Sequence, residues 1–194
     1  IQKINWNQKH IADASYIITF VVDYNKTLEA CRIANKEHVH HNDIESLLVG
    51  GIDAGLIAQS IELILQSQGI GTCFLGLVRL EMLKVKELLN IDGLAFPVLS
   101  MAIGDVEDFE NDPSKLRPRM SYDSFIFDEK YDVKKVIDEV EPYNDIVNKW
   151  WAEKGLDRMG YIEKMADNYS HYYSEKGFEE LQEIGFLNRY KKIK

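Results

Sequence analysis

The chain has 194 residues, of which 45% are hydrophobic, and a formal net charge of -9. This length and hydrophobic content are enough for one domain with a sizeable core, and we expect a single domain over residues 1–194. The acidic balance argues against a nucleic-acid partner, because binding to phosphates needs clustered cations.

The remaining composition indicates a soluble protein of a reducing compartment. The two cysteines, Cys31 and Cys73, form no C-x-x-C pair, so neither a disulfide framework nor a thiolate metal site is predicted. No apolar run approaches the roughly 20 residues of a membrane span, and no signal-peptide pattern is visible. We therefore expect a cytoplasmic location and no membrane partner. Because the sequence begins with Ile1, we also expect that residues precede it in a longer polypeptide or were removed.

The first element expected is a strand at Ser15–Asp23, whose β-branched and aromatic residues are nearly continuously apolar. Such a run favours a central position in a sheet. A short helix and a loop follow, with histidines at His38, His40 and His41. Imidazole is the commonest metal ligand, but this spacing points the side chains apart on a helix, and we favour a solvated loop.

The stretch around which the chain is organised is a long apolar helix from about Asp43 to Gly69. Its hydrophobic residues recur at helical spacing on several faces, which predicts burial on most sides. Asn42 with Glu45 is typical of a capping box, and Gly69 is placed for a left-handed helix end. Three further glycines lie inside the helix, each at a cost of about 1 kcal/mol against alanine, so we expect a backbone or a flat ligand to come close there. These glycines are Gly50, Gly51 and Gly55.

A strand is expected at Thr72–Leu75, directly after Gly69-Ile70-Gly71. These glycines do not form a dinucleotide fingerprint, because they follow a helix and enter a strand, which is the reverse of what pyrophosphate binding at a helix N-terminus requires. Leu80–Asn90 is predicted as an amphipathic helix and Phe96–Gly104 as a buried strand. The inward face of that helix is expected to carry Leu83, Val85, Leu88 and Leu89.

Two arginines flank Pro118 in an acidic, proline-punctuated loop. Proline restricts its own backbone and that of Arg117, so Arg117 and Arg119 lose less entropy on binding a phosphate or carboxylate. The alternative is that they neutralise the acids upstream, and composition alone favours this alternative.

The last third is predicted to be helical and aromatic, after a short strand at Phe125–Phe127. Its two stripes are more typical of packing than of a cofactor site, and they would also suit a subunit interface. No Ser-His-Asp, Cys-His, paired-carboxylate or H-E-x-x-H pattern is present, so no catalytic side chain is predicted. The stripes consist of Tyr143, Ile146, Val147, Trp150 and Trp151, then Tyr161, Met165, Tyr169, Tyr172 and Tyr173.

Several segments together resemble the nitroreductase family, in its NADPH-dependent FMN reductase branch. The similarity covers the central helix with the strand after it, the next strand, a segment resembling K-P-R-L-P … H-E-N-x-Y, and one resembling N/G-Q-K-H-V-A. In chain order these segments are Asn7–Ala12, Asp53–Gln59, Gln68–Gly76, Phe96–Gly104, Lys115–Met120 and Phe127–Tyr131.

The resemblance implies an α+β flavoprotein with a small, mostly antiparallel sheet surrounded by helices, which works as a homodimer with FMN at the subunit interface. Gln8 matches a glutamine used on the flavin ring, and the backbone of Phe74, Leu75, Gly76 and Leu77 matches the segment that lines FMN. Arg117 and Arg119 match the lysine and arginine that hold the phosphate and ring edge. With the resemblance included, we therefore favour ligand binding by these arginines over the alternative in which they only neutralise acids.

The function implied is electron transfer from NADPH or NADH to a nitroaromatic, quinone or flavin. The flavin N5 carries the chemistry, which explains the lack of a catalytic side chain and of a predicted metal. Leu77 stands where the branch often has glycine, Arg158 is the candidate for the NADPH 2′-phosphate, and the family's R-S-x-R stretch is not among these 194 residues. The alternative is a non-catalytic remnant of such an enzyme that binds flavin or dimerises.

Overall fold

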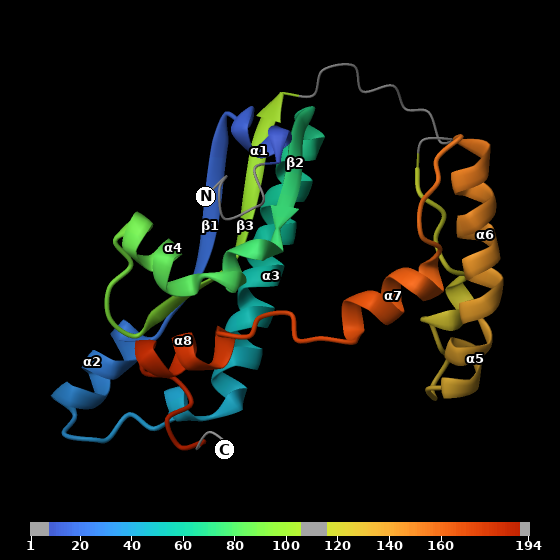
Figure 1. Cartoon of the computed structure of the whole chain (residues 1–194). Helices are drawn as coiled ribbons and strands as arrows, with labels where there is room; N and C mark the ends of the chain where they lie inside the picture. The colour runs from blue at the N-terminus through green and yellow to red at the C-terminus, as the bar shows by residue number, and fades with distance from the viewer. Residues whose placement is uncertain (1–7, 106–115, 191–194) are drawn as a thin grey trace. The chain divides into compact units, whose positions relative to one another are not determined.

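The computed structural model describes residues 8–105 and 116–190, which form two compact units (Figure 1). The first unit contains the described residues up to 105 together with 174–190. The second unit contains residues 116–173. The expectation of one domain over residues 1–194 stays a prediction.

A three-stranded antiparallel sheet forms the centre of the first unit, in the order β1-β3-β2. Its strands are β1 (Tyr16–Asp23), β2 (Ile70–Leu75) and β3 (Ala95–Asp105). The predicted fold class, helices around a small antiparallel sheet, is confirmed. The expectation that Ser15–Asp23 is central is wrong: β1 is an edge strand, and β3 lies between the other two. Within β1, Phe20 and Val22 are buried, whereas Tyr16 and Val21 are exposed.

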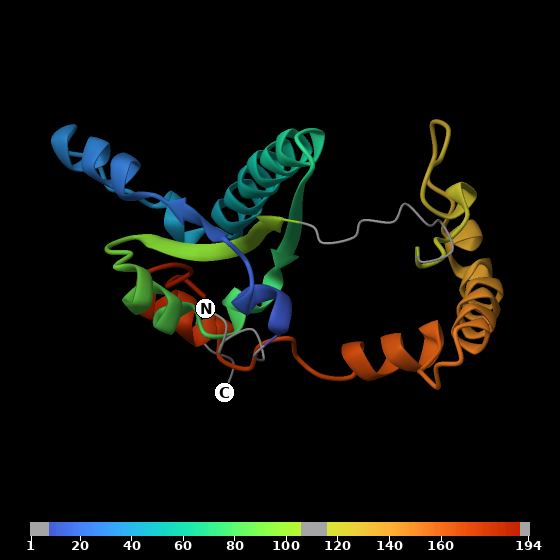
Figure 2. The same ribbon diagram turned by 90° about the horizontal axis from the view of Figure 1, so that it is seen from above.

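Helix α3 (Ile44–Ser67) covers one face of this sheet, as Figure 2 shows from above. Ala54 and Ala58 pack against Phe20 and Met101, because small side chains let the helix approach the strands. The capping box predicted at Asn42 is wrong by one residue, since the cap is Asp43, whose carboxylate accepts the Glu45 backbone N–H.

The predictions for the C-terminal end of α3 and for its internal glycines are confirmed in part. Gly69 has the predicted left-handed conformation, with φ at 76°. A Cβ added at Gly50 would lie 2.6 Å from Val22 Cγ1, so close packing at this glycine is confirmed. At Gly51 and Gly55 a Cβ would meet nothing within 4 Å in this chain.

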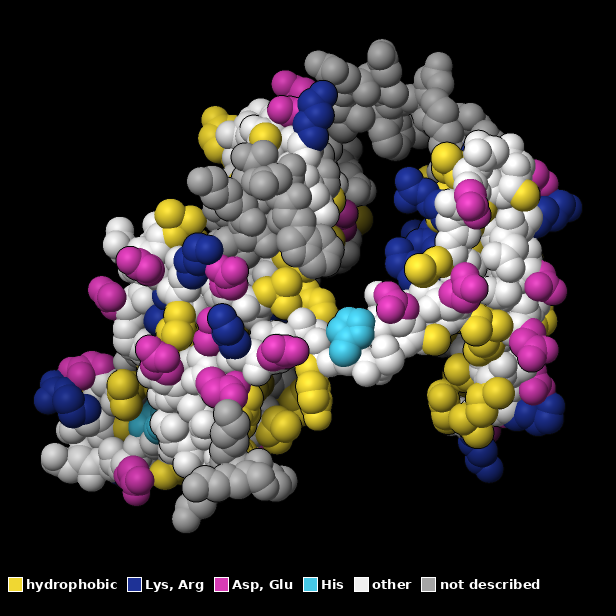
Figure 3. Space-filling model, viewed as in Figure 1, with side chains coloured by type: hydrophobic (Ala, Val, Ile, Leu, Met, Phe, Trp, Pro, Cys, Tyr) yellow, Lys and Arg dark blue, Asp and Glu magenta, His cyan; other side chains and the backbone are white. Residues whose placement is uncertain are grey.

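The other faces of α3 are exposed, which corrects the prediction of burial on most sides. The buried residues of the helix are Ser46, Ala54 and Ala58. Part of its apolar surface is visible in Figure 3. By length and composition α3 could cross a membrane, contrary to the expectation that no apolar run approaches a span, although one such helix is weak grounds for a membrane location. Its exposed large side chains are Ile44, Leu48, Val49, Ile52, Leu56, Ile57, Leu63 and Ile64.

The opposite face of the sheet carries α1 (Lys9–Ala12), α4 (Met82–Leu89) and α8 (Gly177–Ile184) (Figure 2). Phe186, which follows α8, is fully buried, and its ring centroid lies 4.9 Å from that of Phe96 on β3. The Glu180 carboxylate of α8 accepts the Met82 backbone N–H at 2.7 Å, which satisfies the start of α4.

The remaining elements of the first unit are shorter. Helix α2 (Asn25–Ile33) confirms the predicted short helix after β1. On α4, Met82 and Val85 are buried, whereas Leu88 and Leu89 are exposed, so the predicted inward face is wrong at its C-terminal end. The 3-10 segments of this unit are η1 (His40–Asn42) and η2 (Gly76–Leu80).

The second unit is helical, with α6 (Val140–Glu153) at its centre. The strand predicted at Phe125–Phe127 is not formed, and a 3-10 turn, η4 (Tyr122–Ser124), precedes that segment. Asn144 of α6 accepts the Ile162 backbone N–H through Oδ1 at 3.0 Å and so fixes the start of α7. The other helices are α5 (Val133–Asp138) and α7 (Tyr161–Tyr169).

The aromatic stripes of the second unit are buried only in part. Tyr143 and Val147 of the first stripe are buried. Tyr169 and Tyr172 of the second stripe are 85% and 82% exposed, whereas Tyr161 at its start packs against Tyr143. Hydrophobic side chains also gather on the surface at the α5 end of the unit (Figure 3).

Candidate functional site

The residues predicted to bind a flavin fall in both units. Gln8 and the segment from Phe74 to Leu77 belong to the first unit, whereas Arg117 and Arg119 belong to the second. Lys115, which completes the matching motif, lies outside the described residues. Arg117 and Arg119 line different cavities, and a single site formed by all of these residues stays a prediction.

In the first unit, α1 packs on the sheet through Ile11. Ile11 of α1 forms a buried cluster with Leu75 of β2 and Ala102 of β3. Gln8 is the residue before α1 begins, and its side chain does not cap the helix. The side-chain amide of Gln8 is thus not used to cap its own helix. An amide that binds a ligand must not be used in this way.

The predicted flavin-lining segment runs from the end of β2 into η2. Leu75 is only 3% exposed, whereas Phe74 is 37% exposed. Gly76 opens the 3-10 turn, and Arg79 of the same turn donates from Nη1 to the Val98 carbonyl oxygen at 2.8 Å. The turn is therefore fastened to β3, and its backbone is held in one place.

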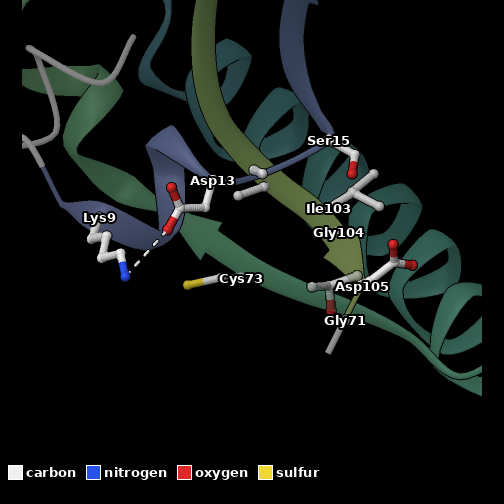
Figure 4. Close-up of a pocket in the computed structure, with 11 residues that line it drawn as sticks. Lys9, Asp13, Ser15, Gly71, Cys73, Ile103, Gly104 and Asp105 are labelled. Carbon is white, nitrogen blue, oxygen red and sulfur yellow. Dashed lines mark ion pairs between the residues drawn. The ribbon is translucent and has the colours of Figure 1, made fainter. Parts of the chain in front are cut away.

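An open cavity of about 700 Å³ lies against the first half of β2 and the end of β3 (Figure 4), and Phe74 to Leu77 are not among the residues that line it. Lys9 of α1 and Asp13, which follows this helix, form an ion pair at 3.9 Å, and Cys73 of β2 is drawn on the same side of Figure 4. Cys73 is exposed, and partial desolvation raises the pKa of its thiol, which disfavours the nucleophilic thiolate. Sequence reasoning missed this cavity, although the facing glycines Gly71 and Gly104 of the paired strands leave it open.

In the second unit, Arg117 lies in a cavity of about 360 Å³ that carries more cations than acids. Its guanidinium carbon is 5.5 Å from the ring centroid of Trp151, and that of Arg158 is 5.3 Å from the same centroid. Stacking on tryptophan of this kind stabilises a cation. The other residues of the cavity are Asp157, Met159 and Lys164. Three cations against one acid make this cavity suitable for an anion.

Buried donors without a partner distinguish this region. Arg117 Nε is buried and has no hydrogen-bond partner among the described residues, and the same holds for the indole nitrogens of Trp150 and Trp151. An unmet buried donor costs about 1–3 kcal/mol. Sequence reasoning assigned the tryptophans to packing, and their neighbourhood to Arg117 was not visible without the fold.

Arg119 faces a different cavity, of about 510 Å³, lined mainly by aromatic residues. Its side chain is exposed. Between the two arginines, the Pro118 carbonyl oxygen accepts a hydrogen bond from the Tyr143 hydroxyl at 2.9 Å. The residues lining this cavity with Arg119 are Met120, Tyr122, Phe125, Tyr143 and Tyr161.

These donors fit the cofactor that the sequence implies. A flavin nucleotide has a phosphate, which needs cations and N–H donors, and a flat ring, which needs aromatic or backbone surfaces. The second unit offers cations and the unmet Arg117 Nε, and the first unit offers the backbone at the β2–η2 junction.

The histidine cluster has contacts of its own. His38 Nδ1 lies 2.8 Å from His41 Nδ1, and His38 Nε2 lies 2.9 Å from Thr27 Oγ1. Burial and the neighbouring histidines lower the pKa of His41. In the part of the chain that the structure describes, no group of three or more His, Cys, Asp or Glu residues could hold a metal ion.

Comparison with protein families identifies two matching models. The model described as the nitroreductase family matches residues 4–105, and that of the nitroreductase family C-terminal domain matches residues 117–189. An NADPH-dependent oxidoreductase of Staphylococcus epidermidis is 28% identical over 188 residues, which covers 94% of this chain and 74% of the relative. One from Staphylococcus aureus is 29% identical over 150 residues and covers 76% of this chain and 59% of the relative.

Solved structures are similar in fold. The hypothetical oxidoreductase YcnD from Bacillus subtilis superposes with a TM-score of 0.85 at 24% identity, covering 95% of this chain and 74% of that one. The NADPH:FMN oxidoreductase from Vibrio harveyi complexed with NAD+ gives a TM-score of 0.77 at 17% identity, covering 97% and 74%. At these identities the likeness shows the fold alone.

Proposed function

This chain belongs to the nitroreductase family, and on that premise we propose that it is an FMN-dependent oxidoreductase that transfers electrons from NAD(P)H to a nitroaromatic, a quinone or a free flavin. The observation that carries the proposal is the buried Arg117 Nε without a partner, in a cavity with two further cations. An anionic ligand would accept a hydrogen bond from this buried N–H donor and would be attracted by the neighbouring cations.

The chain's own residues bind and orient. When bound, FMN supplies hydride chemistry at its N5. With FMN bound, Gln8 would form hydrogen bonds to the flavin ring, and the backbone from Phe74 to Leu77 would line it. Arg117 and Arg119 would hold the phosphate and the ring edge, where cations stabilise negative charge. The proposed reaction needs no side chain of this chain as a nucleophile or general base.

For the reductant we propose NADPH, with Arg158 as the residue that recognises the 2′-phosphate. Arg158 and Lys164 border the same cavity as Arg117, and a guanidinium binds phosphate through paired N–H donors. Changing Arg158 to alanine is expected to raise the KM for NADPH by at least about ten-fold and to leave the KM for NADH within about two-fold, since one charge-assisted hydrogen bond contributes about 1.5–3 kcal/mol. Equal effects on both nucleotides would contradict this role.

We further propose that the partner is a second copy of this chain, paired through α3. The exposed apolar residues of α3 include Leu56 at 65% and Ile52 at 59%, and such a continuous patch marks an interaction surface. The open space at Gly51 and Gly55 would let a second helix approach closely. Pairing buries this surface in a cytoplasmic protein with no need for a membrane.

Replacing Leu56 with glutamate tests the dimer. Light scattering after size exclusion should report a dimer for the wild type and a monomer for the variant, because a charge in an apolar interface is costly. Replacing Lys26 on α2 with glutamate is the control and should leave the dimer intact. A monomeric wild type would contradict the pairing.

The function itself is tested on purified protein with added FMN. We expect a yellow protein after gel filtration, with flavin absorbance, and NAD(P)H oxidation that alternates with reduction of an acceptor. A protein that stays colourless with excess FMN and oxidises neither nucleotide would refute the proposal. If that protein is dimeric, the result would favour instead the non-catalytic remnant that only dimerises.

A further inference from the structure

The segment that carries both arginines is held to helix α6 at two points. The Tyr143 hydroxyl donates to the Pro118 carbonyl oxygen at 2.9 Å, and Trp151, two turns further along α6, lies under the Arg117 guanidinium at 5.5 Å. One contact fixes the backbone between the arginines, and the other fixes one side chain. Both anchors come from the same helix.

Tyr143 is built for this contact rather than for packing alone. It is only 7% exposed, and its ring packs edge-on against that of Tyr161 at a centroid distance of 5.0 Å. A buried phenol of this kind normally finds a hydrogen-bond partner. Here the partner lies 25 residues earlier in the chain, in a segment with no helix or strand of its own.

The two arginines depend on this bond to different degrees. Arg117 has Trp151 as a second anchor. Among the described residues, the exposed side chain of Arg119 forms no ion pair or ring contact, so its direction is set by its backbone. That backbone follows Pro118 directly, and loss of the hydrogen bond at the Pro118 carbonyl would free it.

We propose that Tyr143 is a positioning residue, whose hydroxyl fixes Pro118 so that Arg117 and Arg119 are presented to the anionic cofactor at a set separation. This rests on the proposed function, in which these arginines hold FMN. Preorganisation of this kind improves affinity because the segment loses less conformational entropy on binding. Tyr143 itself need not touch the ligand.

The first experiment compares FMN binding by the wild type, Tyr143→Phe and Tyr161→Phe, measured by quenching of flavin fluorescence on the full chain. Tyr143→Phe should raise the Kd for FMN about three- to ten-fold, which is the range of one net hydrogen bond. Tyr161→Phe removes a hydroxyl from the same cavity but leaves the bond to Pro118, so it should remain within two-fold. The kcat per bound flavin should not change.

A double-mutant cycle separates positioning from general damage. Combined with Arg119→Ala, the Tyr143→Phe change should cost less than it does alone, because its effect passes through the arginine. Melting of the FMN-free proteins provides the comparison for overall stability. Additive effects, or a Tyr143→Phe protein that binds FMN as the wild type does, would overturn the proposal.

A readout without FMN keeps this inference distinct from the proposed function. Trypsin cuts after Arg119 but not after Arg117, which precedes proline, so cleavage between Arg119 and Met120 reports the mobility of the segment. We expect Tyr143→Phe to be cut several-fold faster than the wild type and Tyr161→Phe. If the wild type binds no FMN, the proposed function fails, and faster cleavage still supports the anchoring, whereas unchanged cleavage overturns it.

Discussion

The two units of the chain differ in what their interiors contain. The first unit buries large apolar side chains, among them Phe186, Met101, Val78 and Val85. Among the described residues of the second unit, burial is limited to Ser124, Tyr143, Val147 and Gly160, while Arg117, Trp150 and Trp151 carry buried N–H groups without a partner. The first unit is stabilised by its own packing, whereas the second has donors that another molecule would satisfy.

The largest effect on stability is expected when the Phe186 side chain is removed from the core of the first unit. Phe186→Ala should lower the free energy of unfolding by about 3–5 kcal/mol, because a fully buried aromatic side chain leaves a cavity. Urea denaturation measures the loss. Phe125→Ala in the second unit, where the side chain is 56% exposed, is the matched change and should cost less than about 1 kcal/mol. Equal losses would break the contrast between the units.

Tight packing between α3 and β1 gives the next effect. Gly50→Ala should destabilise the protein by about 1–3 kcal/mol, since the new Cβ would lie 2.6 Å from Val22 Cγ1. Chemical denaturation of the single variant and of Gly50→Ala combined with Val22→Ala measures this. The second change removes the clashing methyl groups, so the combined loss should be smaller than the sum. Additive losses would indicate that the clash is not the cause.

A buried acid in the first unit predicts pH dependence. Burial raises the pKa of Glu180 above its ordinary value, despite the Met82 and Leu83 backbone N–H groups, which lower it. A raised pKa in the folded state means that its contribution to stability is full below the ordinary value and declines as pH rises through the folded pKa. Glu180→Gln keeps an acceptor for Met82 and should remove this decline.

Thermal melts from pH 4 to pH 8 measure the effect of Glu180. Glu183→Gln, at an exposed position on the same helix, is the control and should retain the wild-type profile. Glu180→Ala should cost about 1–3 kcal/mol at either end of the range, because the Met82 N–H loses its acceptor. A wild-type pH profile in Glu180→Gln would assign the decline to another group.

The smallest effect is expected in the second unit. Asn144→Ala removes the acceptor for the Ile162 N–H at the start of α7 and should cost about 1 kcal/mol. Hydrogen exchange at Ile162 measures it and should speed up locally, with amides of the first unit unchanged. Faster exchange in the first unit as well would mean that the two units unfold together.

Local patterns predicted most elements but not their neighbours. The apolar runs of β1, β3 and α3 and the end of α3 at Gly69 follow from side-chain period and glycine conformation. The edge position of β1 does not, because an apolar run is the same whether strands or helices cover it. The exposure of α3 could not be predicted either, because a hydrophobic pattern does not indicate whether the same chain or another molecule covers the helix.

The sequence predicted which residues belong to the candidate site but not how they are arranged in space. The resemblance pointed to Arg117 and Arg119, whose roles stay a prediction. That they line different cavities depends on Tyr143 and Trp151 of a helix that begins more than 20 residues later. The cavity beside Cys73 depends on the register of β2 against β3, and strand register cannot be read from one strand alone.

The first unit is not continuous in sequence, since α8 and Phe186 return to it after the whole second unit has been passed. During synthesis, therefore, the sheet emerges from the ribosome well before the ring that completes its core. Until the last helix is released, Phe96 lacks its partner ring and Met82 lacks its acceptor. The nascent protein would be most open to chaperones and proteases in that interval, and a premature stop after the second unit would leave a sheet that cannot close its interior.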